Sequence, residues 1–176
     1  MEEPSVMTSP DQDLASEQYA AQQYVASSSE RVRDQVERYE ATGGREGGTL
    51  EGRPVVILTM TGAATGKVRK IPVMRIERDG TYLAVASAGG APSHPAWYHN
   101  LLANPEVRVQ DRTTVHRLRA REVFGAEKAK AWQLAESRWP HFPEYRAKAG
   151  REIPILLLEP DRGNERASAT STRSPT

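Results

Sequence analysis

The stretch Pro54–Asn100 constrains the chain most, because it joins two halves of opposite electrostatic character. The segment Gly52–Ile76 carries cations but no acid, and these cations are Arg53, Lys67, Arg69, Lys70 and Arg75. The segment Gly80–Pro105 has no Asp, Glu, Lys or Arg, although charged residues make up 27% of the chain. A basic strand pair beside a neutral segment with glycines and aromatics suits a ligand with an anionic tail and a flat ring.

The composition predicts one globular domain with tails. With 176 residues, of which 38% are hydrophobic, the chain is long enough for one core but not for two. The net charge of +1 does not indicate a protein that coats nucleic acid, so any basic site is local. The absence of cysteine excludes disulfides, a thiolate nucleophile and a cysteine-based zinc site.

The N-terminal residues are acidic and polar, without the basic and apolar regions of a signal peptide. No apolar run approaches the roughly 20 residues that cross a bilayer as a helix. We therefore expect a soluble cytoplasmic protein, with a small molecule and not a nucleic acid as its partner.

Two helices are expected before the core. Residues 1–13 have the composition of a disordered segment, and a first helix is predicted over 14–26. A capping box formed by Ser27 and Glu30 predicts a second helix over about 28–41. The apolar face of that helix follows helical spacing and consists of Val32, Val36 and Tyr39.

The rest of the pattern predicts a sheet built from hairpins. Strands are expected at 55–61, 68–77, 81–87, 107–110, 113–123 and 153–158. Helices are expected at 95–103, 126–139 and 143–149. The pair Asp79-Gly80 is the strongest hairpin signal. Adjacent hairpins favour a mainly β or α+β fold with an antiparallel sheet or small barrel, rather than a βαβ fold.

These elements predict one domain flanked by other segments. The N-terminal helices and a glycine-rich linker occupy 14–53, and the β domain occupies 54–160. Residues 161–176 lack any periodicity and are expected to be a disordered tail.

The turn Gly62–Val68 has some likeness to a phosphate-binding P-loop but does not meet its pattern. Three residues instead of four separate its glycines, Val68 replaces the Ser or Thr after Lys67, and a strand follows. Two interpretations stay open, an anion site made by the turn amides and neighbouring cations, or a hairpin whose cations are merely solvated.

No metal site and no acylating serine are expected. His94 and His99 lie five residues apart without a carboxylate between them, whereas metal pairs on a helix lie four apart. Ser87 lies in Ala-Ser-Ala-Gly, which is not the nucleophile motif of a hydrolase.

Four strings of residues resemble the deazaflavin-dependent nitroreductase family of actinobacteria. They are LTMTGAATGKVRKIPVMR, VASAGGAPSHPAWYHNLLANPEV, AREV and REIPILLLEP, within about residues 30–160. The resemblance implies a split β-barrel, related to pyridoxamine phosphate oxidase-like proteins. It also implies an oxidoreductase that binds coenzyme F-420, a deazaflavin with a phospholactate and oligoglutamate tail. Such enzymes pass a hydride to quinones, nitroaromatics or enones.

The resemblance also implies where the cofactor binds. Positions that match the tail clamp are Thr65, Gly66, Lys67, Arg69 and Lys70. Positions that match the ring seat are Pro72, Met74, Ser87, Ala88, Gly89 and Gly90. The helix that closes the pocket is represented by Trp97, Tyr98 and Asn100. Walls without ionisable groups suit this chemistry, because a hydride must not meet water or a stray proton donor.

The chain departs from the family pattern at the tail clamp and at the substrate cap. After Gly62 the family usually has a Lys or Arg, and this chain has Ala63-Ala64. The family places three tyrosines over the substrate, and the matching residues here are Trp139, Phe142 and Tyr145. Phenylalanine cannot donate a proton, so either His141 or Tyr145 replaces the missing hydroxyl or the pocket takes a different substrate.

The leading interpretation is a reductase that uses coenzyme F-420. One alternative is a relative that has lost the cofactor and catalyses a cofactor-independent cyclisation or isomerisation in natural-product biosynthesis. Another is a carrier protein without turnover. A homodimer is left open. Membrane association of the N-terminal helices is disfavoured, because their apolar faces are narrow and acids are as frequent as bases.

Overall fold

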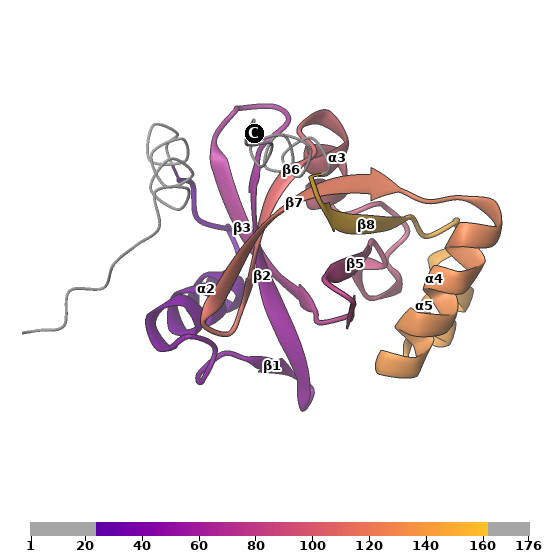
Figure 1. Ribbon diagram of the computed structural model, residues 1–176, viewed down its shortest axis with the longest axis horizontal. Helices are drawn as coiled ribbons and strands as arrows, with labels where there is room; N and C mark the ends of the chain where they lie inside the picture. Colours follow the sequence, from indigo (N-terminus) through magenta and orange to yellow (C-terminus); the bar gives the residue numbers. More distant parts are fainter. Residues whose placement is uncertain (1–23, 162–176) are drawn as a thin grey trace, which may run out of the picture.

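The computed structural model describes residues 24–161, which form a curled antiparallel sheet with helices around it (Figure 1). The strands are β1 (Thr49–Leu50), β2 (Arg53–Thr61), β3 (Val68–Met74), β4 (Glu77–Arg78), β5 (Thr81–Val85), β6 (Glu106–Asp111), β7 (Thr114–Glu122) and β8 (Ile155–Pro160). The helices are α2 (Glu30–Thr42), α3 (Ala96–Ala103), α4 (Gly125–Arg138) and α5 (Phe142–Ala149), with a 3-10 turn η1 (Ala88–Gly90). The mainly β expectation is confirmed.

The sheet must curl because its two edges are joined by a very short connection. The strand order is β1-β2-β6-β7-β8-β5-β4, and β3 pairs with β2. Strands β3 and β4 therefore lie at opposite edges, yet only Arg75 and Ile76 separate them in the chain. Such a connection spans about 10 Å at most. The edges are brought together as a split β-barrel, as predicted.

Alternation along the strands divides the apolar residues between the barrel interior and its outer surface. In β2, Val56, Leu58 and Met60 belong to the interior cluster, whereas Val55 and Ile57 pack against α2. The rest of the interior cluster comes from β5, α3, β6, β7 and β8, namely Tyr82, Ala84, Leu101, Val107, Val109, Leu118, Ala120, Leu156 and Leu158.

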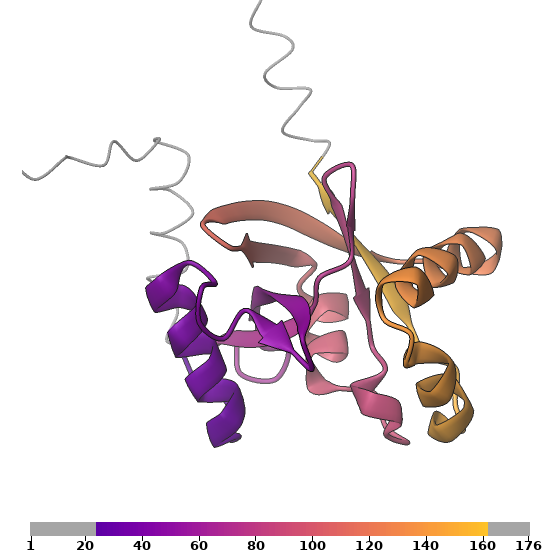
Figure 2. The same cartoon turned by 90° about the horizontal axis from the view of Figure 1, so that it is seen from below.

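Helices cover separate parts of the outer surface. Helix α2 buries Val36 and Tyr39, and it ends at Gly43, whose φ of 61° is the left-handed conformation of a helix C-cap. Helices α4 and α5 bury Trp132 and Phe142 against residues of β5 and β8. Figure 2 shows α2 and the α4–α5 pair on opposite sides of the molecule, with α3 between them. No helix within 24–161 has the length and apolar character to cross a membrane.

The prediction for the first helix was wrong where the structure can test it. Residues 1–23 lie outside the described part of the chain, as do all residues of the predicted tail after 161. Residues 24–26 are not helical, because Tyr24 forms a parallel bridge with Val68 of β3. The capping box was also wrong. The helix begins at Glu30, so Ser29 is the cap, and its hydroxyl accepts from the Val32 amide at 3.4 Å.

The prediction of one strand over 68–77 was wrong near its C-terminal end, where Arg75 and Ile76 separate β3 from β4. The Arg75 amide still donates to Pro54 of β2, but the Ile76 carbonyl already accepts from Leu83 of β5. The strand breaks at these two residues because the chain exchanges one edge partner for the other. The next hairpin turn was predicted correctly, and φ is 53° at Asp79 and 82° at Gly80.

Candidate functional site

A cavity of about 380 Å³ lies between the end of β3, the turn η1, α3 and α5. It collects most of the residues that the sequence assigned to a ring seat and a substrate cap, which are Pro72, Met74, Ser87, Ala88, Gly89, Trp97, Trp139, Phe142 and Tyr145. The remaining wall consists of Arg31, Leu50, Val55, Val73, Ile76 and Val85. Segments far apart in the sequence therefore build one site.

The cavity offers hydrogen-bond donors on an otherwise apolar wall. The residues of its lining that carry donor groups are Arg31, Ser87, Tyr145, Trp97 and Trp139. No carboxylate is among the described residues that line it. A ligand that presents carbonyl or anionic oxygen is therefore complementary to these walls.

The turn η1 brings backbone to the cavity in an unusual conformation. Ala88, Gly89 and Gly90 have φ values of 47°, 63° and 85°, all in the left-handed region. This conformation costs roughly 1–2 kcal/mol for alanine and little for glycine. At Gly90 a Cβ atom would lie 3.2 Å from the Cα atom of Tyr145 and from Cδ of Lys148. Glycine is therefore needed where η1 packs against α5.

Arg151, which the sequence analysis missed, holds the ends of this turn. Its Nη2 atom donates to the carbonyl oxygens of Ala86 at 3.1 Å and Ser87 at 3.2 Å. Its Nε atom donates to the carbonyl oxygen of Ala91 at 3.0 Å. The sequence feature that could have identified Arg151 is a cation between the C-cap Gly150 and an apolar strand. The carbonyl of Ser87 also accepts from the Gly90 amide of the turn at 2.9 Å, so Arg151 matters most for the carbonyls of Ala86 and Ala91.

Two aromatic residues near the turn, His94 and Tyr98, have pKa values shifted by their surroundings. Arg151 Nη1 lies 2.8 Å from Nδ1 of His94, which must accept because arginine has no acceptor. Burial, and then the charge of Arg151, lower the pKa of His94. The Tyr98 hydroxyl donates to Glu122 at 2.6 Å, and burial and this bond raise the pKa of Tyr98 to about 12. Tyr98 therefore supports α3 and does not line the cavity.

The basic turn after β2 is linked to the cavity through α3. The amide of Ala63 donates to Oδ1 of Asn100 at 2.9 Å. The turn is closed by the Gly62 amide, which donates to the Lys67 carbonyl at 2.7 Å. Asn100 lies about one helical turn from Trp97 of the cavity wall, so the turn and the cavity are neighbours along α3.

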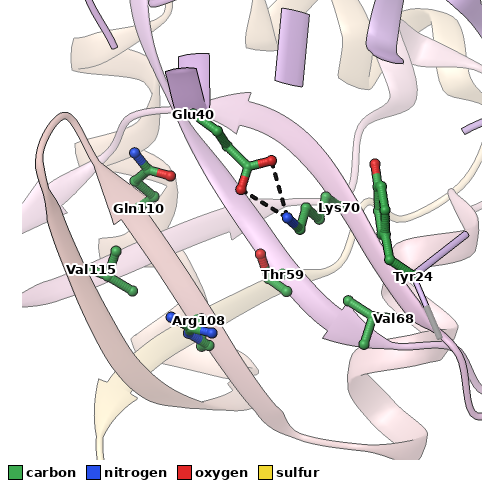
Figure 3. A pocket seen from close by; sticks show the side chains of 8 residues that line it. All are labelled: Tyr24, Glu40, Thr59, Val68, Lys70, Arg108, Gln110 and Val115. Carbon is green, nitrogen blue, oxygen red and sulfur yellow. Dashed lines mark hydrogen bonds and ion pairs between the residues drawn. The ribbon is translucent and has the colours of Figure 1, made fainter. Parts of the chain in front are cut away.

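Arg69 and Lys70 do not share a face, because successive strand residues point to opposite sides. A Cβ atom at Gly62 would lie 3.7 Å from Cγ of Arg69, so Arg69 flanks the turn. Lys70 forms an ion pair with Glu40 at 2.8 Å and lies over the ring of Tyr24 at 4.8 Å (Figure 3). Lys70 therefore belongs to a separate polar pocket beside α2.

At the cap, Trp139 and Phe142 are buried and His141 is not. The guanidinium of Arg53 lies 5.6 Å from the ring centroid of Trp139. The ring of His141 packs edge-on against Trp139 at 4.9 Å and stacks near Tyr145 at 6.3 Å, but it does not line the cavity. Tyr145 is thus the phenol of the cap that faces the cavity.

Comparisons with known proteins agree on one family. Residues 31–160 match the family model described as F420H(2)-dependent quinone reductase. An F420H(2)-dependent quinone reductase of Mycobacterium tuberculosis strain H37Rv is 34% identical over 124 residues, which cover 68% of this chain and 83% of the relative.

Solved structures give the same result. An F420-H2 dependent reductase, FDR-A, superposes with a TM-score of 0.58 and is 47% identical, covering 61% of this chain and 95% of that chain. A structure described as a domain-swapped dimer superposes with a TM-score of 0.60 and is 44% identical, covering 72% of this chain and 96% of that chain. The family match, the curated relative and the shared split barrel together show that this chain belongs to the F420H(2)-dependent quinone reductase family.

Proposed function

We propose that this protein transfers a hydride from reduced coenzyme F-420 to a small apolar acceptor such as a quinone, a nitroaromatic or an enone. The observation that carries the proposal is the meeting of the ring-seat residues Met74, Ser87 and Trp97 with the cap residues Trp139 and Tyr145 around one cavity. The bound deazaflavin supplies the hydride, and the protein supplies orientation and a dry site.

The cavity fits a flat heteroaromatic ring. Pro72 and Met74 form one wall, and the left-handed backbone of Ala88 and Gly89 forms another. Backbone without bulky side chains permits close approach to a ring, and its amides and carbonyls are suited to the polar edge of a deazaflavin. Trp97 of α3 contributes an aromatic surface beside the ring seat.

We assign the clamp for the anionic tail to the turn that follows β2. Lys67 and Arg69 supply charge, and the exposed Thr65 and Gly66 supply hydroxyl and backbone donors. Asn100 holds this turn on α3, at the end of the helix that also forms the cavity wall. Lys70 points to the outer face and would contribute only after it released Glu40.

On the acceptor side we assign the hydrogen bond, and the proton where one is needed, to Tyr145. Trp139 and Phe142 shape the acceptor pocket, because both are buried and neither has an ionisable group. His141 lies outside the lining of the cavity. The protein thus combines apolar walls with one phenol, which suits an acceptor whose carbonyl oxygen becomes negative as it receives hydride.

The test is a titration of coenzyme F-420 with purified protein, followed by its fluorescence, together with reduction of menadione in the presence of the reduced cofactor. We expect saturable quenching and cofactor-dependent turnover. The absence of saturable quenching would refute the proposal. The domain-swapped relative makes a homodimer the assembly to examine, by light scattering of the same sample.

The alternative of a cofactor-independent cyclisation or isomerisation is favoured by Phe142, which lines the cavity without a hydroxyl, and by the uncharged Ala63-Ala64. The variant Ala64→Lys separates the two functions. If the protein is a reductase, an added cation at the turn is expected to raise the cofactor affinity roughly tenfold and to speed reduction at limiting cofactor. A gain in affinity without any cofactor-dependent turnover would favour the alternative.

A further inference from the structure

The first turn of α2 brings one cation to the cavity wall. Arg31 is the charged member of a lining that otherwise consists, within the described residues, of apolar, aromatic and hydroxyl side chains. Its guanidinium has no hydrogen-bond or ion-pair partner in the part of the chain from 24 to 161. Leu50, 38% exposed, borders the same side of the cavity. Arg31 is itself exposed, so it lies where the cavity meets solvent.

The position of Arg31 is held by contacts in which its own charge takes no part. Helix α2 is capped by Ser29 and anchored by Val36 against the barrel. The side-chain amide of Gln35 donates to the carbonyl oxygens of Gly47 at 3.0 Å and Thr49 at 3.2 Å. These bonds join α2 to the segment that leads into Leu50, so both sides of this entrance are fixed.

A neighbouring arginine shows the contrast. Arg33 donates to the carbonyl oxygen of Ser27 at 2.7 Å and so supports the start of the helix. Arg31 has no such role, and a guanidinium beside apolar walls gains most from an anionic partner. Its planar fork matches a carboxylate with two parallel hydrogen bonds.

We propose that Arg31 is a specificity residue that selects acceptors bearing an ionised acidic group, such as a carboxylate, beside the reducible ring. The inference rests on the proposed function, because it assumes that the acceptor occupies this cavity. The reducible ring lies between the cap residues, and the acidic substituent reaches the entrance at Arg31. The reaction is unchanged: a quinone gains the hydride of the reduced cofactor and one proton, and becomes a hydroquinone.

The experiment compares two probes with the same reducible ring, a naphthoquinone with an ionised propionate side chain and its uncharged methyl ester. Because the charge is separated from the ring, both quinones have nearly the same tendency to accept hydride. The variants are Arg31→Gln, Arg31→Lys and Arg31→Glu. Arg38→Gln is the matched control, because Arg38 is exposed on the same helix and does not line the cavity.

The readouts are the ratio of kcat/KM for the acid to that for the ester, and the ratio of their dissociation constants measured by calorimetry without turnover. Taking a ratio removes any effect of a substitution that is the same for both probes. Arg31→Gln is expected to lower the preference for the acid roughly tenfold, and Arg31→Glu to lower it further. Arg31→Lys should retain part of the preference, and Arg38→Gln should match the unmodified protein.

Equal ratios in the unmodified protein and Arg31→Gln would overturn the inference, as would an equal loss in Arg38→Gln. The ratio of dissociation constants from calorimetry tests the role of Arg31 even if no acceptor is reduced. Reduction of the ester with unchanged ratios would refute the role of Arg31 while leaving the proposed reductase function intact. Selective binding of the acid without any cofactor-dependent turnover would refute the reductase function while supporting Arg31 as an anion-selective residue.

Discussion

The guanidinium of Arg151 donates to the carbonyl oxygen of Ser87 at 3.2 Å, across a sequence separation of 64 residues. The turn η1, to which we assign part of the ring seat, is thereby held by the segment that follows α5. We expect Arg151→Met to lower the free energy of unfolding by about 1–3 kcal/mol, because partly buried carbonyls lose their donors. Cofactor affinity should fall as well. Urea unfolding and fluorescence titration measure the two effects.

Arg151→Lys separates the charge of this residue from its geometry. Lysine retains the positive charge but cannot span the carbonyls of Ala86 and Ala91 with a planar fork. Only partial recovery of cofactor affinity is expected. Arg117→Gln, on the exposed face of β7, is the control for loss of a surface arginine. Full recovery by lysine would mean that the charge alone matters.

Stability below neutral pH should depend on His94. Burial and the charges of Arg151 and His99 lower its pKa in the folded protein, while Glu122 acts in the opposite direction. The unfolded chain then binds more protons than the folded one below about pH 6.5, the ordinary value for histidine. The free energy of unfolding should therefore fall as the pH drops from 7.5 to 5.5.

The variant His94→Asn isolates this contribution. Its amide oxygen can accept from Arg151 without taking up a proton. Melting temperatures at both pH values should show a smaller loss on acidification for His94→Asn than for the unmodified protein. An identical loss in both would show that protonation of His94 does not oppose folding.

Arg69 and Lys70 are neighbouring cations on β3, but they should contribute differently to the affinity for the cofactor. Arg69→Gln is expected to weaken binding of coenzyme F-420 roughly tenfold, through loss of a charge-assisted contact with the tail. Lys70→Gln should have little effect, because Lys70 is paired with Glu40 on the outer face. Fluorescence titrations with the complete cofactor and with its tail-free chromophore test this. The Arg69 effect should disappear with the chromophore, and an equal effect of Lys70→Gln would contradict the assignment.

The phenol of Tyr145 should matter for turnover more than for binding. We expect Tyr145→Phe to lower kcat for a quinone roughly a hundredfold with a small change in KM, as for loss of a general acid. His141→Gln should have a much smaller effect, because His141 does not line the cavity. Steady-state rates in ordinary and heavy water measure both variants. A larger loss for His141→Gln would transfer the role to histidine.

Much of the fold could be predicted because its signals are local. The pair Asp79-Gly80 specifies a tight hairpin by its own backbone preferences, and Pro140 cannot continue the helix that precedes it. The break at Arg75–Ile76 could not be seen, since it depends on a change of strand partner and not on the residues themselves. The cap at Ser29 was missed because any of three successive serines satisfies the same local rule.

Pro72, Met74 and Ser87 were assigned to the site through the resemblance to a known family, and all three line the cavity. Arg31 and Arg151 were missed because their positions depend on packing between elements that are distant in sequence. The pairing of Lys70 with Glu40 could not be predicted either, because Glu40 lies 30 residues away in sequence. The family resemblance therefore gave most of the cavity walls, and tertiary structure added Arg31 to the lining and Arg151 behind the turn η1.

The close packing at Gly90 also affects which acceptors the proposed site can admit. Because a Cβ atom at Gly90 of η1 would already lie 3.2 Å from the Cα atom of Tyr145 in α5, the helix to which we assign the substrate cap has little space to shift toward the turn to which we assign the ring seat. Enlarging the acceptor space must move α5 outward or displace the turn with it. The size of the acceptor and the seating of the cofactor are therefore adjusted together, and a change that broadens one is expected to loosen the other.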